Sequence, residues 1–162
     1  MDTPRRAELA MKVLNHAIVG DADEAMRLMG EIAANSDGKQ MFGVCCGFAN
    51  SAQQTLVQLF GQPAQESLWV LAAPDPAGGP TPPAHTFALR FVTAWCNRDL
   101  PTCQALYIAA TLASGEEYAH SVSALIGLTV HLARVAAEEL AADSEKPAQH
   151  PHAAPRSGPR PR

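Results

Sequence analysis

The sequence of 162 residues predicts an all-α fold of about six helices, arranged as two pseudo-repeated three-helix units that share one core. Apolar residues recur every three to four positions through most of the chain, which is the period of a helix. Capping residues precede these stretches, and we find no convincing strand. The third observation is an internal repeat: residues 7–36 align with residues 85–114, apolar on apolar and turn residue on turn residue. A self-similar stretch of this length indicates one structural unit built twice.

The first unit is expected to cover residues 4–60. Its first helix is predicted over residues 4–19, where apolar side chains follow the helical period. The second helix follows Asp21, and Glu24 stands three positions later, which is the spacing of a capping box. A third helix follows the next polar turn, where Asp37 and Gln40 form another possible cap, and ends near residue 60.

The second unit is expected to cover residues 85–142 and to repeat this order. Its first helix is predicted over residues 85–97. Asp99 then caps a second helix, which has a proline in its first turn, where the missing N–H costs little. Ser114 and Glu117 have the spacing of another capping box, in front of a long last helix.

A connection rich in proline and glycine separates the units, and a tail follows them. The connection spans residues 61–84, and most of it is expected to be irregular. Residues 66–73 are apolar enough to form a short helix or an extended segment docked on the body, with Trp69 as its anchor. Residues 1–143 are therefore expected to form one helical domain. The tail, residues 144–162, has almost no large apolar residue and is predicted to be disordered.

Composition limits the class of partner. The net charge is −4, and the last twenty residues carry four of the twelve basic side chains but only two of the sixteen acidic ones. The body is therefore acidic and a poor match for a phosphate backbone, so no nucleic-acid partner is expected. No signal peptide is evident, and no run of about 18 apolar residues would span a bilayer. A cytoplasmic location without membrane association is therefore predicted.

Small residues on two of the predicted helices suggest where helices meet. Gly43 and Gly47 are four positions apart in the third helix, and glycine costs a helix interior roughly 1 kcal/mol relative to alanine. Close approach of the last helix, where Ala124 and Gly127 are also small, is the expected reason. The third and last helices are then the central pair. A subunit interface along the same glycine face is the alternative.

Metal and cofactor chemistry find little support in the sequence. Glu117 and His120 have the Glu-x-x-His spacing of di-iron helical bundles, but residues 40–43, their counterparts in the first unit, offer no such ligands. We therefore expect Glu117 to cap a helix, and neither a metal nor another cofactor to bind. The adjacent Cys45 and Cys46 point about 100° apart on a helix and cannot chelate as a Cys-x-x-Cys pair does.

The preferred hypothesis is a non-enzymatic interaction or regulatory protein that binds another protein, or itself, through a helical surface. Its candidate packing or interface residues are Gly43, Gly47, Ala124, Gly127 and Trp69. The alternative is a small-molecule-binding protein or enzyme with a pocket between the two units, lined by Cys45, Cys46, Trp95, Tyr118 and His120. A third hypothesis, a redox-sensing thiol protein, requires an exposed cysteine with a lowered pKa.

Overall fold

The computed structural model describes residues 1–64, 67–72 and 81–145, and these residues form six helices and no strand. In chain order they are α1 (Thr3–Ile18), α2 (Ala22–Ala34), α3 (Gly38–Phe60), α4 (Pro83–Cys96), α5 (Leu100–Leu112) and α6 (Gly115–Glu145). The predicted all-α fold is confirmed. Helix α4 begins two residues earlier than predicted, and α6 continues past residue 142. The predicted disordered tail lies, from residue 146 on, outside the described residues.

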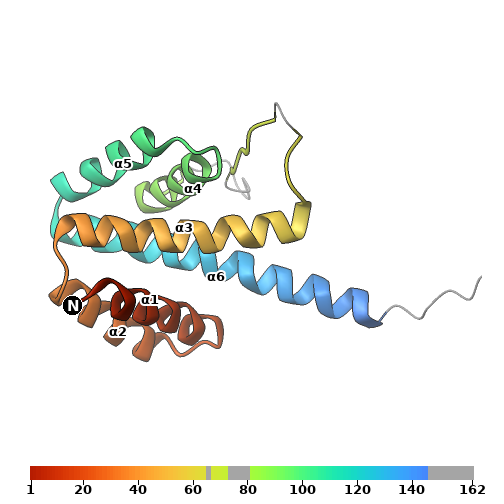
Figure 1. Cartoon of the computed structure of the whole chain (residues 1–162), viewed down its shortest axis with the longest axis horizontal. Coiled ribbons are helices and arrows are strands. Elements are labelled where there is room, and N and C mark those ends of the chain that lie inside the picture. The colour runs from red at the N-terminus through yellow and green to blue at the C-terminus, as the bar shows by residue number, and fades with distance from the viewer. Residues whose placement is uncertain (65–66, 73–80, 146–162) are drawn as a thin grey trace, which may run out of the picture.

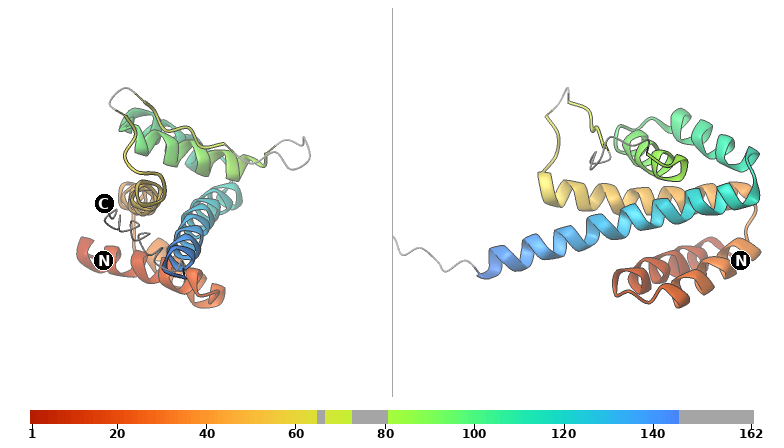
Figure 2. Two further views of the ribbon diagram at one scale, coloured as in Figure 1. Left: turned by 90° about the vertical axis from the view of Figure 1, so that its right-hand side faces the viewer. Right: turned by 180° about the vertical axis from the view of Figure 1, so that it is seen from behind.

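The helices form three layers, with α3 and α6 side by side in the middle (Figures 1 and 2). Helices α4 and α5 cover one side of this pair, and α1 and α2 cover the other. Helix α4 contacts both central helices, as α1 does, whereas α2 packs chiefly on α1. The prediction that the third and last helices form the central pair is therefore confirmed.

One hydrophobic core joins all six helices. Phe48 of α3, Phe91 of α4 and Leu125 of α6 are among its largest fully buried side chains. The hydroxyl of Thr129, also buried, donates to the carbonyl of Leu125 at 2.9 Å and lies 3.3 Å from the carbonyl oxygen of Phe48. A polar contact within the core thus joins the two central helices and leaves the hydroxyl satisfied.

Side-chain caps begin five of the six helices. Asp37 and Gln40 form a reciprocal capping box in front of α3, with bonds of 2.8 and 3.0 Å. Ser114 and Glu117 form the same arrangement in front of α6, at 3.0 and 3.1 Å. The carboxylates of three further aspartates accept from the first turns of α1, α2 and α5: Asp2, Asp21 and Asp99. These bonds satisfy backbone donors that the helices leave unpaired.

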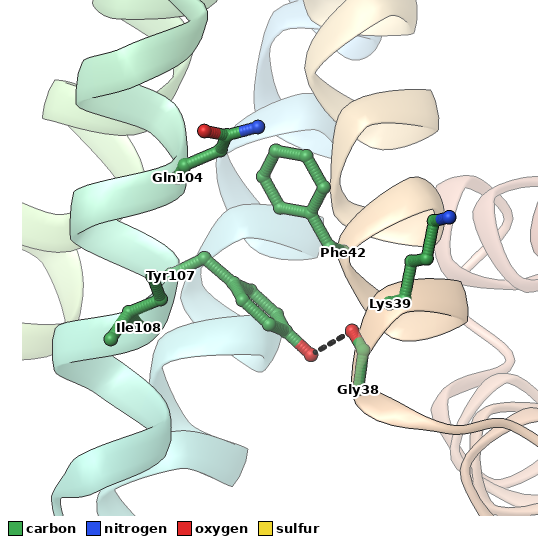
Figure 3. Close-up of a pocket in the computed structure, with 6 residues that line it drawn as sticks. All are labelled: Gly38, Lys39, Phe42, Gln104, Tyr107 and Ile108. Atoms are coloured by element: carbon green, nitrogen blue, oxygen red, sulfur yellow. Dashed lines mark hydrogen bonds between the residues drawn. The ribbon is translucent and has the colours of Figure 1, made fainter.

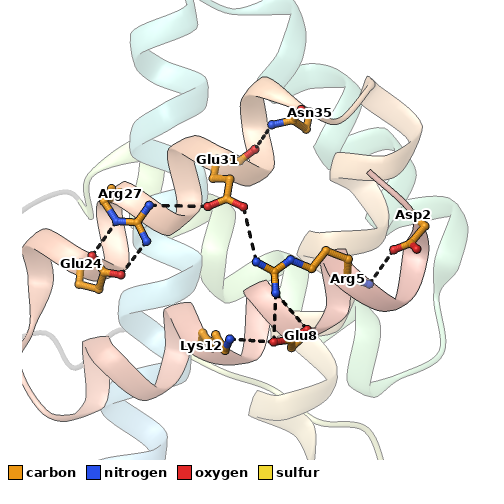
Figure 4. Close-up of polar contacts among 8 residues, drawn as sticks. All are labelled: Asp2, Arg5, Glu8, Lys12, Glu24, Arg27, Glu31 and Asn35. Atoms are coloured by element: carbon orange, nitrogen blue, oxygen red, sulfur yellow. Dashed lines mark hydrogen bonds and ion pairs between the residues drawn. The ribbon is translucent and has the colours of Figure 1, made fainter.

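Ion pairs cover the outer face of the α1–α2 layer (Figure 4). Arg5 pairs with Glu8 at 3.2 Å within α1 and reaches Glu31 of α2 at 3.9 Å. The remaining Lys and Arg pairs join Lys12 to Glu8, Arg27 to Glu24, and Arg27 to Glu31, and His16 Nδ1 lies 2.9 Å from a carboxylate oxygen of Asp21. All are solvent-exposed, and such pairs add little stability. Their main consequence is a charged surface on this side of the molecule.

Arginine side chains also fix the α1–α2 layer in place. Arg134 of α6 donates to the carbonyls of Ala17 and Ile18 at 2.8 and 3.0 Å, at the end of α1. A cation there gives the last carbonyls of the helix a charged donor and interacts favourably with the helix dipole. The buried Arg6 donates to the Ser36 hydroxyl at 3.1 Å, so α1 is tied to the turn in front of α3 as well.

The glycines of α3 do not mark a close helix approach. An added Cβ at Gly43 or Gly47 would meet no atom within 4 Å, and the same holds at Gly127 of α6. All three are exposed, whereas Ala124 is half-buried. The prediction that these glycines allow a close approach of the two helices is therefore wrong. Helices α3 and α6 meet along other faces, which carry large side chains such as Phe48. The alternative, a subunit interface on the glycine face, stays a prediction.

The long helix α6 also has the length and composition of a membrane span from Gly115 to Ala142. Core helices of globular proteins meet the same two criteria, and α6 contacts α1, α3, α4 and α5. The absence of membrane association therefore stays a prediction.

The turns after α1 and α4 are closed in the same way. Gly20 and Arg98 both have positive φ, +87° and +59°. The next residue in each turn, Asp21 or Asp99, donates its N–H at 2.8 Å to a carbonyl five positions earlier. These turns occupy equivalent positions in the predicted internal repeat, and the repeat itself stays a prediction.

Reciprocal substitutions test the backbone strain at these two turns. Gly20→Ala is expected to lower the free energy of unfolding by about 1 kcal/mol, because alanine adopts left-handed φ less easily than glycine. A Cβ there meets nothing within 4 Å, so no clash contributes. Arg98→Gly is expected to be neutral or to stabilise by up to about 1 kcal/mol. Urea unfolding measures both changes. A Gly20→Ala variant as stable as the unaltered chain, or an Arg98→Gly variant clearly less stable than it, would contradict this account.

Candidate interaction surface

Helix α5 carries no charged residue, although it lies on the surface. The sequence has none from Leu100 to Gly115. Only Cys103 and Tyr107 of α5 are buried. Leu106 and Ala110 are partly buried against the core, and most of the other residues are exposed to solvent, among them leucine, isoleucine and alanine.

Residues at every fourth position form an exposed stripe along α5. We call Leu100, Gln104, Ile108 and Leu112 the α5 stripe. The side chain of Ile108 is 55% exposed, and that of Leu112 is 82% exposed. Scattered exposed apolar residues are normal on protein surfaces, but a contiguous uncharged stripe is typical of an interaction site. The α5 stripe is therefore the candidate interaction surface.

A shallow groove lies beside the α5 stripe, between α5 and the beginning of α3 (Figure 3). Its volume is about 220 Å³, and its lining consists of Gly38, Lys39, Phe42, Gln104, Tyr107 and Ile108. Two of these residues, Gln104 and Ile108, belong to the stripe. Pockets for drug-sized ligands usually measure about 300–1,000 Å³. The groove is thus better matched to one inserted side chain of a partner than to a whole small molecule.

Aromatic rings fix the base of the groove. The Tyr107 hydroxyl donates to the carbonyl of Gly38 at 2.8 Å and lies 3.2 Å from the Tyr118 hydroxyl. The ring of Phe42 packs edge-on against Tyr107, with centroids 5.4 Å apart, and also against Phe91. Burial raises the pKa of Tyr107 and Tyr118 above the ordinary tyrosine value. Both hydroxyls therefore remain protonated near neutral pH.

The five residues predicted to line a pocket lie at different depths. Cys45 is fully buried; Cys46, Trp95 and Tyr118 are half-buried; His120 is exposed. None of them lines this groove or the second concavity, which lies beside residues 67–72. Tyr118 comes nearest, since it is bonded to the Tyr107 that does line the groove. The hypothesis of a pocket built from these five residues gains no support from their placement.

The four cysteines, all within the described residues, are free thiols with raised pKa values. Burial raises the pKa of Cys45 to about 12 and that of Cys46, Cys96 and Cys103 to about 11. A redox-sensing cysteine needs a lowered pKa and access to solvent. The redox hypothesis is therefore unsupported at each of the four positions.

Glu117 acts as a helix cap, as predicted. Its carboxylate accepts from the N–H of Ser114, and this bond is the main reason why the pKa of Glu117 is lowered. The part of the chain that the structure describes contains no group of three or more His, Cys, Asp or Glu side chains placed to hold a metal ion. His120, the other half of the Glu-x-x-His pair, is exposed.

No prediction from the sequence covered the α5 stripe. The predictions relied chiefly on glycines inside helices and on residues able to bind metals or catalyse reactions, and α5 has no glycine, histidine or acidic residue. The available signal was the uncharged run after Asp99, which is longer than a surface helix normally carries. The groove could not be found in the same way, because it depends on how α5 packs against α3.

The Tyr107 hydroxyl is expected to stabilise the junction of α5 with α3. Tyr107→Phe should lower the free energy of unfolding by about 1 kcal/mol, because it removes a hydrogen bond to the carbonyl of Gly38. Tyr118→Phe is the matched control, since it leaves that bond in place and should cost less. Urea denaturation followed by circular dichroism measures both changes. An equal or larger cost for Tyr118→Phe would contradict the assignment.

Thiol burial predicts a loss of stability at alkaline pH. Unfolded cysteines ionise near pH 8.5, whereas the folded thiols stay protonated to about pH 11. Their contribution to stability is therefore complete below about pH 8.5 and is lost as the pH rises toward 11. Urea unfolding at pH 7 and pH 10 should show the decrease, and Cys46→Ala should reduce it. Rapid reaction of a native thiol with a disulfide reagent at pH 8 would contradict this prediction.

No protein-family model matches the chain, no curated protein matches it, and no solved structure matches it. Function therefore has to be inferred from the residues and their geometry.

Proposed function

We propose that this chain is a non-enzymatic interaction module that binds another protein, or a second copy of itself, through the α5 stripe. The observation that carries the proposal is the exposed apolar surface of a helix without a single charge. Burial of apolar side chains is the dominant favourable term in most protein–protein association. The groove beside the stripe, with an aromatic base, gives a partner a place to insert one side chain.

The distribution of charge also supports this proposal. The sequence from Gln40 to Ala64, which includes nearly all of α3, has no charged residue, so Lys39 is the one charged side chain of α3 and the one charged residue that lines the groove. The exposed Gly43 and Gly47 belong to this stretch. The ion pairs, by contrast, lie on α1 and α2 on the other side of the central helices. Because charged residues are depleted in the core of protein interfaces, the α5 side is the better candidate.

The small-molecule alternative has weaker support. The groove between α3 and α5 is smaller than usual ligand pockets. The concavity beside residues 67–72 reaches that size, about 430 Å³, but none of the five residues predicted to line a pocket lines it. We keep the cytoplasm as the proposed location, since the four cysteines are free thiols and the cytosol keeps thiols reduced. The contacts of α6 with four other helices support its role as a core helix of the domain.

Charge introduced into the α5 stripe tests the proposal. Ile108→Asp combined with Leu112→Asp should abolish association, because a carboxylate buried in an apolar interface would be desolvated without a partner. Met26→Asp is the matched control: Met26 is 74% exposed on α2, in the opposite layer. Affinity capture with mass spectrometry and analytical ultracentrifugation are performed on all three forms.

The expected result is a partner, or a dimer, that the unaltered chain and Met26→Asp retain and the double variant loses. Circular dichroism checks that the helices of each variant are intact. A chain that stays strictly monomeric at high concentration and captures no partner would overturn the proposal. So would a partner that the double variant binds as well as the unaltered chain does.

A further inference from the structure

Residues 67–72 lie along α4 as an extended segment, which we call the strap. The sequence analysis left open whether residues 66–73 form a helix or a docked extended segment. The described part, residues 67–72, is not helical, and Trp69 and Leu71 pack against the core. The expectation of a docked segment anchored by Trp69 is confirmed for these six residues.

The side chain of Asn97 pairs with the backbone of the strap as a neighbouring strand would. Its amide oxygen accepts from the N–H of Trp69 at 2.8 Å, and its amide nitrogen donates to the carbonyl of the same residue at 2.9 Å. One turn earlier, the Thr93 hydroxyl accepts from the N–H of Leu71 at 3.4 Å. Two side chains at the end of α4 therefore bind alternate residues of an extended chain through its backbone.

The spacing explains why a helix can bind a strand in this way. Residues four apart on a helix are about 6 Å apart along its axis. Residues two apart on a strand are about 6.7 Å apart, and they present their N–H and C=O groups on the same edge. Thr93 and Asn97 thus match the repeat of an extended peptide that runs antiparallel to α4. Because only backbone groups of the strap are bonded, this part of the recognition does not depend on its sequence.

Side chains of the strap alternate between the core and solvent. Trp69 and Leu71 are half-buried, whereas Leu68 is 73% exposed and Val70 is 82% exposed. The inward positions therefore hold an aromatic and an aliphatic residue against the core, and Leu68 and Val70 are not packed against it. A concavity of about 430 Å³ remains beside the strap, lined in part by Arg90, Thr102 and Leu68. The strap therefore does not fill the groove in which it lies.

We propose that Thr93 and Asn97 of α4 form a recognition site for an extended peptide of another protein with an aromatic-x-aliphatic pattern, and that the strap occupies this site in the free chain. A partner peptide replaces the strap by making the same three backbone hydrogen bonds and by inserting its own aromatic and aliphatic side chains. The strap itself indicates which side chains the site accepts: an aromatic residue and, two positions later, an aliphatic one. Addition of an extended peptide through backbone bonds is an established mode of recognition.

Exchange of the strap for a partner is energetically feasible because few contacts hold it. Three hydrogen bonds and two half-buried side chains are offset by the conformational entropy lost when six residues are ordered. A peptide from outside must additionally give up translational freedom. A longer peptide that also fills the remaining concavity gains contacts that the strap lacks. A partner peptide must therefore bind the site with a more favourable free energy than the strap does.

A peptide with the sequence of residues 67–72, carrying a dye and two added lysines for solubility, tests the site. The protein is the full chain with Trp69→Gly and Leu71→Gly, which removes both anchors of the strap. Fluorescence anisotropy should show saturable binding to this double variant. The unaltered chain should bind at least about tenfold more weakly, because its own strap occupies the groove.

Asn97→Ala in the same double variant should weaken binding by about tenfold or more, because two hydrogen bonds to the peptide are lost. Asn50→Ala is the matched control, since Asn50 is an exposed residue of α3 away from the strap, and it should leave binding unchanged. Absence of saturable binding, or equal binding by the Asn97→Ala form, would overturn the proposal. Ile108→Asp should not affect this peptide, so failure of the α5 proposal would be seen separately.

A second measurement covers the case in which the double variant does not fold. In the full chain with Trp95→Phe, Trp69 is the only tryptophan and reports on the strap. Asn97→Ala should then shift its emission to the red and make it more accessible to a quencher, with unchanged helical circular dichroism. Adding an excess of the same peptide, without dye and with phenylalanine in place of its tryptophan, should produce the same shift when Asn97 is present, because the strap tryptophan is then the only one in the sample. If neither shift occurs, the strap is not exchangeable and the proposal is wrong.

Discussion

Helices α3 and α6 pack against each other along most of α3, and every other helix takes its position from this pair. Phe48 and Leu125 are fully buried where the two helices meet, and Thr129 adds a hydrogen-bonded contact between them. In each outer layer one helix makes most of the contact with the pair: α4 on one side and α1 on the other. The second helix of each layer, α5 or α2, keeps a large part of its surface in solvent.

The two outer layers differ in the charge that they present to solvent. Glu8 and Glu31 organise cations on α1 and α2, so that layer presents a charged surface to solvent. The α4–α5 layer has few charges, and two of its surface features, the α5 stripe and the strap, present apolar side chains outward. The central pair separates a solvated side from a side suited to binding. Both proposals about function concern the second side, through different elements.

Local signals in the sequence were sufficient for the helices. The spacing of Asp37 with Gln40 and of Ser114 with Glu117 predicted two helix starts, because a capping box is made within four residues. The reason for Gly43 and Gly47 could not be predicted, since small residues suit a close contact and an open surface equally well. The groove and the Asn97 contact with the strap were also missed. Each joins segments distant in sequence, and neither follows a local spacing rule.

The exposed glycines of α3 affect how the molecule folds. Two glycines inside one helix lower its intrinsic helicity, and α3 has no charged pairs after Lys39 to compensate. In isolation, this segment would be less helical than a segment of the same length without glycine, because most helical stability in proteins comes from tertiary packing. The helicity of the central element is therefore imposed by its neighbours. If α6 unfolds, α3 loses the packing that keeps it helical and unfolds as well. The domain should therefore unfold as one cooperative unit and not layer by layer.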